Sequence, residues 1–443
     1  MLKKSTPPPT PADLFRSQLI NVIDMRHRLV KLSGLIDWRG LDESLSPHFC
    51  AEKGRPAHSI RLMCGLLLLK EIEGVSDEGV VERWVENPYW QYFCGEEYFQ
   101  HKFPMDASNL VHFRHRIGEE GMERLLQETV VIGLKVGVIT PNDLKRVTMD
   151  STVQEKAIRY PTDTHLYHKA RLELVKLAEK MNVSMRQSYT RLSKEAVFMA
   201  NKSMASRKVK QGRAWIKKGK NYLGRVIRNI EREISGAPHL QEIFAAHLQK
   251  ARQIFNQQRC DSNKLYSWHA PEVECIAKGK ASKPYEFGCK ANYTTTNKSN
   301  FVIGAQAKHG KPYDGKILQD GLQQIAKITG VIPERCYVDQ GYKKHGVTTT
   351  TIFMSRQKRG ITPQIKRELK RRNAIEPIIG HMKHDGGIGA RNYLKGIIGD
   401  KNNAILIAVG FNLRKILRFL LLCLINSWRL LTRNTMLTML QIA

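Results

Sequence analysis

The hydrophobic pattern of the first third of the chain predicts helices. Residues 58–73 form a strongly apolar stretch, Gly74 interrupts it, and a second helical pattern begins at Ser76. Residues 106–117 predict a third helix. Its apolar positions recur at helical spacing: Leu110, Phe113 and Ile117. We therefore expect a helical domain. Its helix–Gly–helix spacing permits a helix-turn-helix motif, although any small helical bundle gives the same pattern.

A period of two replaces the helical period further along the chain. Residues 146–150 predict one strand, and alternation of apolar and polar residues over 285–293 predicts another. The elements expected after these are a partner strand at 300–307, a helix at 317–329, a strand ending at Asp339, a strand at 348–355 and a helix. That last helix should start at Thr362, because Thr362-Pro363 combines an N-cap residue with proline at the first helical position.

A strongly basic segment separates the first strand from the others. Residues 165–235 hold 18 Lys and Arg against 5 Glu, with helical periodicity and few helix breakers. Such a segment suits a DNA backbone, because contacts with phosphates release counterions. We expect residues 165–260 to be a basic helical insertion, with Lys217 and Lys218 among its DNA contacts. A disordered basic arm is the alternative.

The two ends of the chain predict different structures. Residues 1–14 are rich in proline and are expected to be disordered. A C-terminal helix is expected over 401–443. Its segment 404–424 is apolar but contains three cations: Arg414, Lys415 and Arg418. Because each cation is costly at the centre of a bilayer, this segment predicts a buried or interface helix and not a membrane span.

Charge and cysteine usage narrow the class of protein. Lys and Arg number 72 against 41 Asp and Glu, a net charge of +31. This excess implies a polyanionic partner, and nucleic acid is favoured far above a membrane. The eight cysteines form no Cys-x-x-Cys pair, so a structural zinc site is not expected, and their scatter fits a reducing cytoplasm. The first residues lack the apolar core of a signal peptide.

Three acids stand in contexts that suggest a shared site. Asp150 and Asp339 end short β-branched runs, and Glu376 lies in a helical stretch rich in Lys and Arg. Mg²⁺ prefers carboxylate oxygens, so three such acids in a very basic chain suggest a divalent-metal site that acts on a phosphodiester. Taken singly, either aspartate is as readily a turn residue.

The stretch around Glu376 is the most specific of the three. Arg372, Glu376 and Lys383 fall within about 40° of one helical face, at 100° per residue. The simpler explanation of the four-residue spacing between Arg372 and Glu376 is an exposed ion pair on the helix surface. Pro377 removes the backbone hydrogen bond to the carbonyl of Asn373, so we expect a kink just after Glu376.

In these residues the chain resembles the DDE transposases of bacterial insertion sequences, in particular the insertion-sequence five group. The signature of that larger class is Tyr-x2-Arg-x3-Glu-x6-Lys. Arg372, Glu376 and Lys383 match it at the right spacing, and Leu369 stands at the Tyr position.

The other two acids match the same families. The second acid of the group lies in an Asp-x-Gly-Tyr/Phe motif, which matches Asp339, Gly341 and Tyr342. Its first acid lies at a strand end, which matches Asp150. Further stretches look like the group and extend the resemblance over residues 15–425: 54–61, 268–280, 392–396 and 410–414.

The resemblance implies an α/β fold with a ribonuclease-H-like catalytic core, and the predicted order of strands and helices agrees with that core. The core would comprise residues 141–164 and 261–400, with the basic insertion between them. A helical DNA-binding domain over 15–140 would precede it.

The resemblance also implies the chemistry. Asp150, Asp339 and Glu376 would be catalytic and would bind two Mg²⁺ or Mn²⁺ ions. Water would attack the phosphodiester at the transposon end and free a 3′-OH, which would then attack target DNA. Arg372 and Lys383 would hold DNA phosphates. The implied partners are double-stranded DNA, at element ends and target, and at least one more copy of the chain, in the bacterial cytoplasm at the nucleoid.

Weaker candidates complete the expected site. We interpret His381 as a further contact near the acids. Arg114 and Arg116 lie outside the apolar face of the third predicted helix, so we expect them to face solvent or to contact DNA. Glu272 or Glu274 either assists the acids or has a structural role, and the structural role is favoured.

Two other functions are open from the sequence. A catalytically inactive copy would still bind the ends of its element, and a host nuclease of the same fold would cleave DNA without joining it. The presence of all three acids favours an active enzyme. The Arg-x3-Glu-x6-Lys spacing favours transposition over simple hydrolysis.

Overall fold

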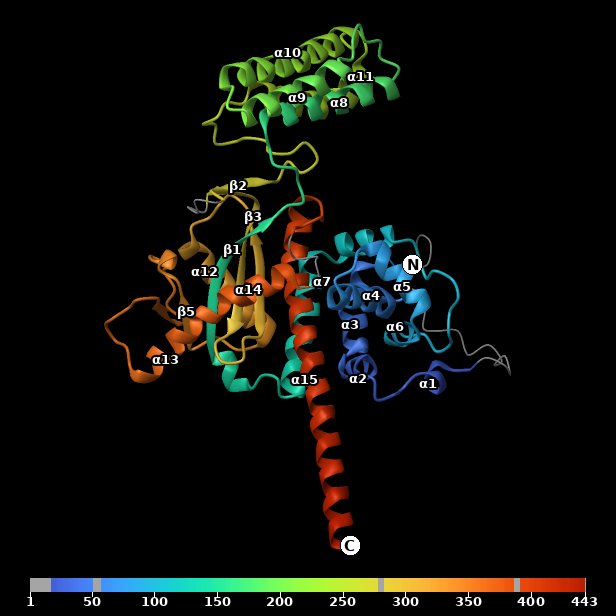
Figure 1. The fold of residues 1–443 in the computed structure, drawn as a ribbon, viewed down its shortest axis with the longest axis vertical. Coiled ribbons are helices and arrows are strands. Elements are labelled where there is room, and N and C mark those ends of the chain that lie inside the picture. The colour runs from blue at the N-terminus through green and yellow to red at the C-terminus, as the bar shows by residue number, and fades with distance from the viewer. Residues whose placement is uncertain (1–16, 51–56, 278–282, 386–390, 443) are drawn as a thin grey trace. The chain divides into compact units, whose positions relative to one another are not determined.

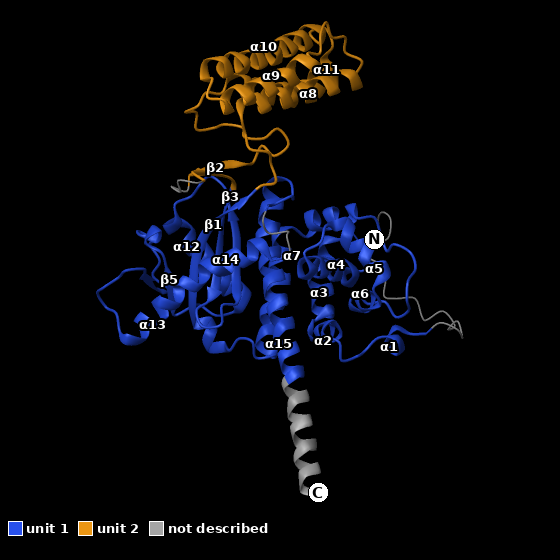
Figure 2. Ribbon diagram, viewed as in Figure 1, with its two compact units in different colours: residues 1–155, 289–443 blue, residues 156–288 orange. Residues whose placement is uncertain are grey.

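The structure is a computed structural model of the 443-residue chain. It describes residues 17–50, 57–277, 283–385 and 391–442, with the side chains of the last helix described as far as residue 425. The predicted disordered tail, residues 1–14, lies outside the described residues, as does the start of the 54–61 stretch. The chain divides into two compact units, residues 1–155 with 289–443 and residues 156–288 (Figure 2).

The first unit begins with helices, as the hydrophobic pattern predicts (Figure 1). Their bounds are α1 Leu19–Val22, α2 Arg28–Leu35, α3 Trp38–Leu45, α4 Ile60–Glu73, α5 Asp77–Glu86, α6 Pro88–Phe93 and α7 Ser108–Lys135. The predicted stop at Gly74 is confirmed, because this residue ends α4 in the left-handed conformation with φ 66°. Gly118, with φ 57°, breaks α7 directly after the predicted third helix.

The sheet brings together strands that are far apart in the sequence. They are β1 Arg146–Glu155, β2 Glu274–Ala277, β3 Tyr285–Thr296, β4 Val302–Lys308, β5 Arg335–Val338 and β6 Thr351–Met354. β1 lies between β3 and β5. β5 is parallel to both β1 and β6, whereas β2 and β4 are antiparallel to β3. The predicted pairing of β3 with β4 is confirmed, and the mixed sheet with its helices gives an α/β fold.

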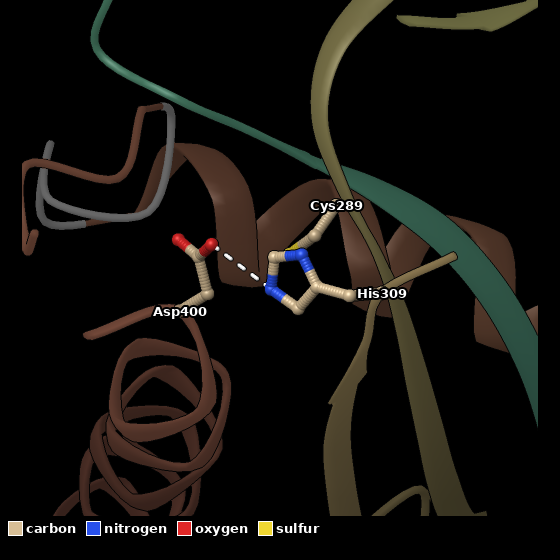
Figure 3. A group of neighbouring side chains, drawn as sticks. All are labelled: Cys289, His309 and Asp400. Atoms are coloured by element: carbon tan, nitrogen blue, oxygen red, sulfur yellow. Dashed lines mark ion pairs between the residues drawn. The ribbon is translucent and has the colours of Figure 1, made fainter. Parts of the chain in front are cut away.

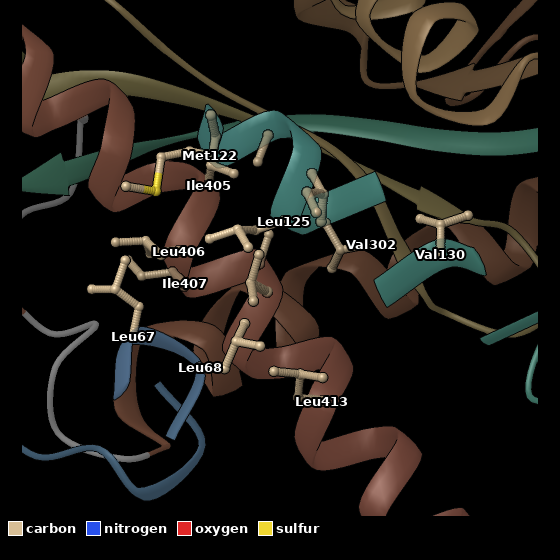
Figure 4. Close-up of a cluster of buried hydrophobic side chains, with 14 of the residues drawn as sticks. Leu67, Leu68, Met122, Leu125, Val130, Val302, Ile405, Leu406, Ile407 and Leu413 are labelled. Atoms are coloured by element: carbon tan, nitrogen blue, oxygen red, sulfur yellow. The ribbon is translucent and has the colours of Figure 1, made fainter. Parts of the chain in front are cut away.

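The later helices of the first unit pack against strands of this sheet. They are α12 Asp314–Thr329, α13 Pro363–Arg371, α14 Ile375–His384 and α15 Gly396–Ile442. Buried side chains of α4, α7, β4 and α15 meet in one apolar cluster, as Figure 4 shows for Leu67, Leu125, Val302 and Ile405. The N-terminal helices and the sheet therefore share one core.

The sequence predicts that the apolar stretch 404–424 is buried, and in the structure its first half is buried. Ala404 to Val409 are buried, whereas Leu421 and Leu422 are exposed. Asn412 is also buried, and its amide bonds the backbone N–H and C=O of Val302 and the hydroxyl of Thr129. Among the described residues no helix is both long enough and apolar enough to cross a membrane.

The described residues of the second unit contain four helices with their own core. They are α8 Asp163–Lys180, α9 Thr190–Ala205, α10 Val209–Glu233 and α11 Pro238–Asn256. Leu174, Leu223 and Phe244, from three of these helices, are buried in one apolar cluster. The segment predicted as an insertion, 165–260, lies within this unit. This segment therefore forms packed helices with an apolar core, and not the disordered basic arm that was the alternative prediction.

The helix break near Glu376 differs from the prediction. Thr362 caps α13 by accepting from the N–H of Ile365, as predicted. The break, however, precedes Glu376: a 3₁₀ turn over Arg372–Ala374 separates α13 from α14. Pro377 thus lies in the first turn of α14, where the N–H that proline lacks has no helical partner anyway. The prediction of a kink just after Glu376 is therefore wrong.

Candidate functional site

Asp150 on β1 and Asp339 directly after β5 occupy equivalent positions relative to the register of these two adjacent parallel strands. The last registered pair of β1 and β5 is Thr148 with Tyr337, and each aspartate comes two residues later. Because parallel strands advance in the same direction, this equal offset brings the two carboxylates to the same part of the sheet. The backbone N–H of Ser151 donates to Asp150 (2.8 Å), and the hydroxyl of Ser355 donates to Asp339 (2.6 Å).

Arg372 and Glu376 approach from the next helices. Nη1 of Arg372 lies 4.0 Å from Oδ2 of Asp150, and the guanidinium is buried. This nitrogen has no hydrogen-bond partner. Glu376 is exposed on α14, which packs on β1. The structure therefore gathers Asp150, Asp339 and Arg372, with Glu376 at the solvent side.

The electrostatics of Asp150 show how closely these charges act on one another. Burial raises the pKa of Asp150 to about 6, and the charges of Asp339 and Glu376 act in the same direction. The N–H of Ser151 and the cation of Arg372 act in the opposite direction. The pKa of Asp339 is lowered, chiefly by its hydrogen bond from Ser355 and also by Arg372. Accumulated negative charge around a buried carboxyl favours a cation there.

The chemistry of the three acids fits a hard divalent cation, because all their donor atoms are carboxylate oxygens. Their spacing is wider than that of a closed metal site. Within the described residues, three His, Cys, Asp or Glu ligand atoms lie within 4.8 Å of one another in a different group, Cys289, His309 and Asp400. The ligand atoms of Asp150, Asp339 and Glu376 thus do not all lie within 4.8 Å of one another.

Lys383 and His381 both lie on α14 and contact other protein groups. The ammonium of Lys383 donates to the hydroxyl of Thr152 (2.9 Å) and to the carbonyl of Val153 (2.7 Å). It therefore attaches α14 to β1 three residues beyond Asp150. His381 is exposed and forms an ion pair with Asp385 at 3.2 Å. These contacts are made with groups other than the three acids.

Sequence reasoning missed the polar layer beneath Asp150. The hydroxyl of Ser151 donates to Asp314 (2.7 Å), as does the ammonium of Lys290 (3.1 Å). The buried Tyr342 of the Asp-x-Gly-Tyr motif donates to the amide oxygen of Asn292 (3.3 Å). Burial raises the pKa of Tyr342, with the charges of Asp150 and Asp314 acting in the same direction. No local sequence signal marks Asp314, because its role depends on how α12 meets the sheet.

A hollow of about 640 Å³ opens beside Asp339. Two further cations line it together with Arg372: Arg356 and Lys370. Leu369, the residue at the Tyr position of the signature, also lines it. A space bordered by one acid and three cations suits a phosphate group.

The interpretation of Arg114 as a solvent-facing or DNA-facing residue is wrong. Arg114 is 2% exposed, and its guanidinium donates to both carboxylate oxygens of Asp77 (2.9 and 2.5 Å). Lys70, also buried, donates to the same carboxylate (2.7 Å). Helical spacing placed Arg114 on the polar face of its helix. It could not predict that an acid on α5, Asp77, lies opposite this side chain. Arg116 is exposed, as expected, and lies over the ring of Phe49.

The expected contacts on the basic segment lie on α10. Lys217 and Lys218 are both exposed, and Lys218 lies 3.9 Å from the ring centre of Trp215. They belong to a larger basic stripe of exposed cations along this helix: Lys210, Arg213, Lys217, Lys218, Arg225, Arg228 and Arg232. At 100° per residue these positions fall within about 140° of one face. The length from the first to the last is about 33 Å.

Glu272 forms a buried ion pair within the second unit. Its carboxylate pairs with Lys156 at 2.8 Å, and both side chains are almost fully buried. This favours the structural interpretation over assistance to the acids.

Comparison with known proteins gives two matches. Residues 17–116 match the transposase domain DUF772. Over 201 residues the chain is 49% identical to the uncharacterized protein ORF8 in the nfe locus of Rhizobium meliloti, an alignment that covers 45% of this chain and 97% of that protein. No solved structure matches the chain. The first match lies within the segment predicted as the helical N-terminal domain.

Proposed function

The chain belongs to a transposase family, and from this premise we propose that it is a DDE transposase of the insertion-sequence five group. It would cleave DNA at the terminal inverted repeats of its element and join the freed 3′-OH to target DNA. The observation that carries this proposal is the equal offset of Asp150 and Asp339 from the last registered pair of the parallel strands β1 and β5, with Arg372 beside Asp150.

The strand arrangement supports a ribonuclease-H-like core. The antiparallel pair β3 and β4 lies on one side of β1, and the parallel strands β5 and β6 lie on the other. The first acid would then stand on the central strand, the second directly after its neighbour, and the third on a helix packed against the central strand. This is the arrangement that the family resemblance implies.

Asp150, Asp339 and Glu376 would hold two Mg²⁺ or Mn²⁺ ions, because their oxygens are the donors these ions prefer. Such ions would supply a Lewis acid and a water of lowered pKa for attack on the phosphodiester. No side-chain nucleophile is needed for hydrolysis followed by attack of the 3′-OH.

The residues around the acids would orient the substrate. Arg372 has a buried nitrogen without a hydrogen-bond partner, which a phosphate oxygen would satisfy. Lys383 would act by holding α14 on β1, so that Glu376 keeps its position relative to Asp150. Arg356 and Lys370, on the hollow beside Asp339, would hold the next phosphates of the strand.

The N-terminal helices and α10 are the proposed surfaces for double-stranded DNA. The basic stripe on α10 is about as long as one turn of the DNA double helix, about 34–36 Å. Its cations would contact phosphates and position the duplex without reading the sequence. Synapsis of two ends would need at least two copies of the chain.

The test uses the purified protein, Mg²⁺ or Mn²⁺, and a labelled duplex that carries the ends of the element next to supercoiled target DNA. Cleavage at the ends and joining, both lost in Asp339→Ala and Glu376→Ala, are expected. Glu368→Gln would not serve as a control, because Glu368 is buried in ion pairs. The exposed Glu334→Gln is suitable instead.

The alternative functions give different outcomes in the same assay. Salt-sensitive binding of the ends without cleavage would indicate a DNA-binding relic. Cleavage without joining would indicate a nuclease. Joining that persists in both acid variants would disprove the assignment of these acids.

A further inference from the structure

A second group of metal-ligand side chains lies apart from the three acids. Cys289 is on β3, His309 directly follows β4, and Asp400 is in the first turns of α15 (Figure 3). One ligand atom from each lies within 4.8 Å of the others. Lys290 pairs with Lys308 in the register of β3 and β4. One further step along the same register brings Cys289 opposite His309.

The separation between two of these atoms fits a tetrahedral metal centre. Nε2 of His309 lies 3.2 Å from Oδ2 of Asp400. Two ligands bound to Zn²⁺ at about 2.0 Å and at the tetrahedral angle lie about 3.3 Å apart. The observed separation therefore suits two atoms that share one ion as well as it suits an ion pair.

The residues around the group hold its ligands in place. Nδ2 of Asn392 donates to Oδ1 of Asp400 (2.5 Å), which leaves Oδ2 facing His309. Nε2 of Gln154 donates to the carbonyl of Asp400 (3.0 Å) and lies 4.0 Å from Sγ of Cys289. Such bonds to metal ligands orient them. Asn392 belongs to the 392–396 stretch, for which the proposed transposition chemistry gives no role.

Gln154 gives an independent indication of a missing partner. Its side chain is 5% exposed, yet its Oε1 has no hydrogen-bond partner. A buried amide oxygen normally accepts at least one hydrogen bond. A water in the fourth position of a metal ion held by Cys289, His309 and Asp400 would donate one.

We propose that Cys289, His309 and Asp400 bind one Zn²⁺ ion, or another thiolate-preferring divalent ion of the same class. Thiolate and imidazole select such ions, whereas Mg²⁺ and Mn²⁺ prefer the all-carboxylate site. The ion joins the end of the β3–β4 pair to the start of α15. It thereby fixes the long helix that packs on β4, α7 and α4. The cysteine spacing did not suggest zinc, because the ligands are 20 and 91 positions apart in the sequence.

Cobalt substitution in the full-length protein tests this proposal. After removal of metal with a chelator, Co²⁺ is added and the thiolate-to-cobalt charge-transfer band is recorded. We expect a band that saturates at one ion per chain, is lost in Cys289→Ser, and is retained in Cys260→Ser, which changes an exposed cysteine. Retention of the band in Glu376→Ala would show that this site is separate from the acids.

A second measurement guards against a variant that merely fails to fold. Zn²⁺ should raise the melting temperature of the metal-free wild-type protein, and His309→Asn and Asp400→Asn should lower the Zn²⁺ affinity at least tenfold while keeping the wild-type circular dichroism spectrum. A folded wild-type protein that shows neither a cobalt band nor stabilisation by Zn²⁺ would overturn the proposal. So would a band that persists in Cys289→Ser.

Discussion

The guanidinium of Arg372 lies 4.0 Å from the carboxylate of Asp150, and both side chains are largely withdrawn from solvent. This contact connects the central strand to the 3₁₀ turn that precedes α14. The same cation lowers the pKa of Asp339. Arg372 therefore acts on both aspartates of the candidate site, and it limits the repulsion that would otherwise separate them.

Replacing Arg372 by Gln should shift the pH dependence of cleavage upward. Loss of the cation removes an interaction that lowers the pKa of both Asp150 and Asp339. The lower limb of the pH–rate profile should move by about one unit toward higher pH. Single-turnover cleavage rates between about pH 5 and 9 measure this shift. Arg371→Gln, at the exposed neighbouring position, should leave the limb in place, and an unmoved limb in the Arg372 variant would contradict the prediction.

Asp150→Asn should stabilise the protein at alkaline pH. The pKa of Asp150 is raised to about 6 by burial, so the folded protein binds this proton more tightly than the unfolded chain does. The stabilisation by the proton is complete below about pH 4 and is lost as the pH rises through about 6. At about pH 8, in the presence of chelator, the variant should gain about 1–2 kcal/mol in free energy of unfolding, a gain that disappears toward about pH 4.

Urea unfolding at several pH values measures this effect. Asp42→Asn, an exposed acid on α3, serves as the control for a simple change in net charge. An Asp150→Asn variant that is less stable than wild type at alkaline pH would show that the contact with Arg372 outweighs burial.

Asp77→Ala should strongly destabilise the first unit. Asp77 accepts hydrogen bonds from two buried cations, Arg114 and Lys70. Removing one partner of a buried ion pair leaves uncompensated charge and costs about 3–5 kcal/mol. Chemical denaturation of Asp77→Ala and Arg114→Ala measures the loss, and the exposed Arg116→Ala should lose less than about 1 kcal/mol. Weaker DNA binding by Arg114→Ala at unchanged stability would restore the DNA-facing interpretation.

Local rules were reliable where neighbouring residues decide the structure. The cap Thr362 with Pro363, the stop at Gly74 and the alternation over 285–293 each correspond to an observed element. For the cap and the stop, the hydrogen bond or the backbone angle involves residues close in sequence, so the local sequence contains the explanation. The alternation predicts a strand but does not identify its distant neighbour β1.

Features that depend on partners distant in sequence could not be predicted. Arg114 looked solvent-facing because its partner Asp77 is 37 positions away. The polar layer of Asp314 and Tyr342 depends on the packing of α12 and on the turn after β5. The adjacency of β1 and β5 entered only with the family resemblance, because the paired positions, such as Arg146 and Arg335, are far apart in the sequence.

The basic stripe on α10 should determine part of the salt dependence of DNA binding. Removing one phosphate contact reduces the slope of log K against log salt by about 0.9. The triple variant Lys210→Gln, Arg213→Gln and Lys217→Gln should therefore reduce the slope by up to about 3. Fluorescence anisotropy with a duplex at several salt concentrations measures the slope.

The matched control removes the same charge from a different helix. Arg191, Lys194 and Lys202 are exposed on α9, and their triple change to Gln should alter the slope less. Equal changes in the two triple variants would indicate that only net charge matters and that α10 has no special role.

Asn412→Leu should destabilise the protein although it makes an apolar segment more apolar. Asn412 is fully buried on α15, with its amide bonded to both backbone groups of Val302 and to the hydroxyl of Thr129. Leucine would add apolar burial worth about 2 kcal/mol, but it would leave the N–H and C=O of Val302 without these bonds at about 1–3 kcal/mol each. The hydrogen-bond cost should exceed the gain, so urea unfolding should show a net loss of about 1–3 kcal/mol. A more stable variant would mean that β4 finds other partners and that Asn412 is retained for a reason other than stability.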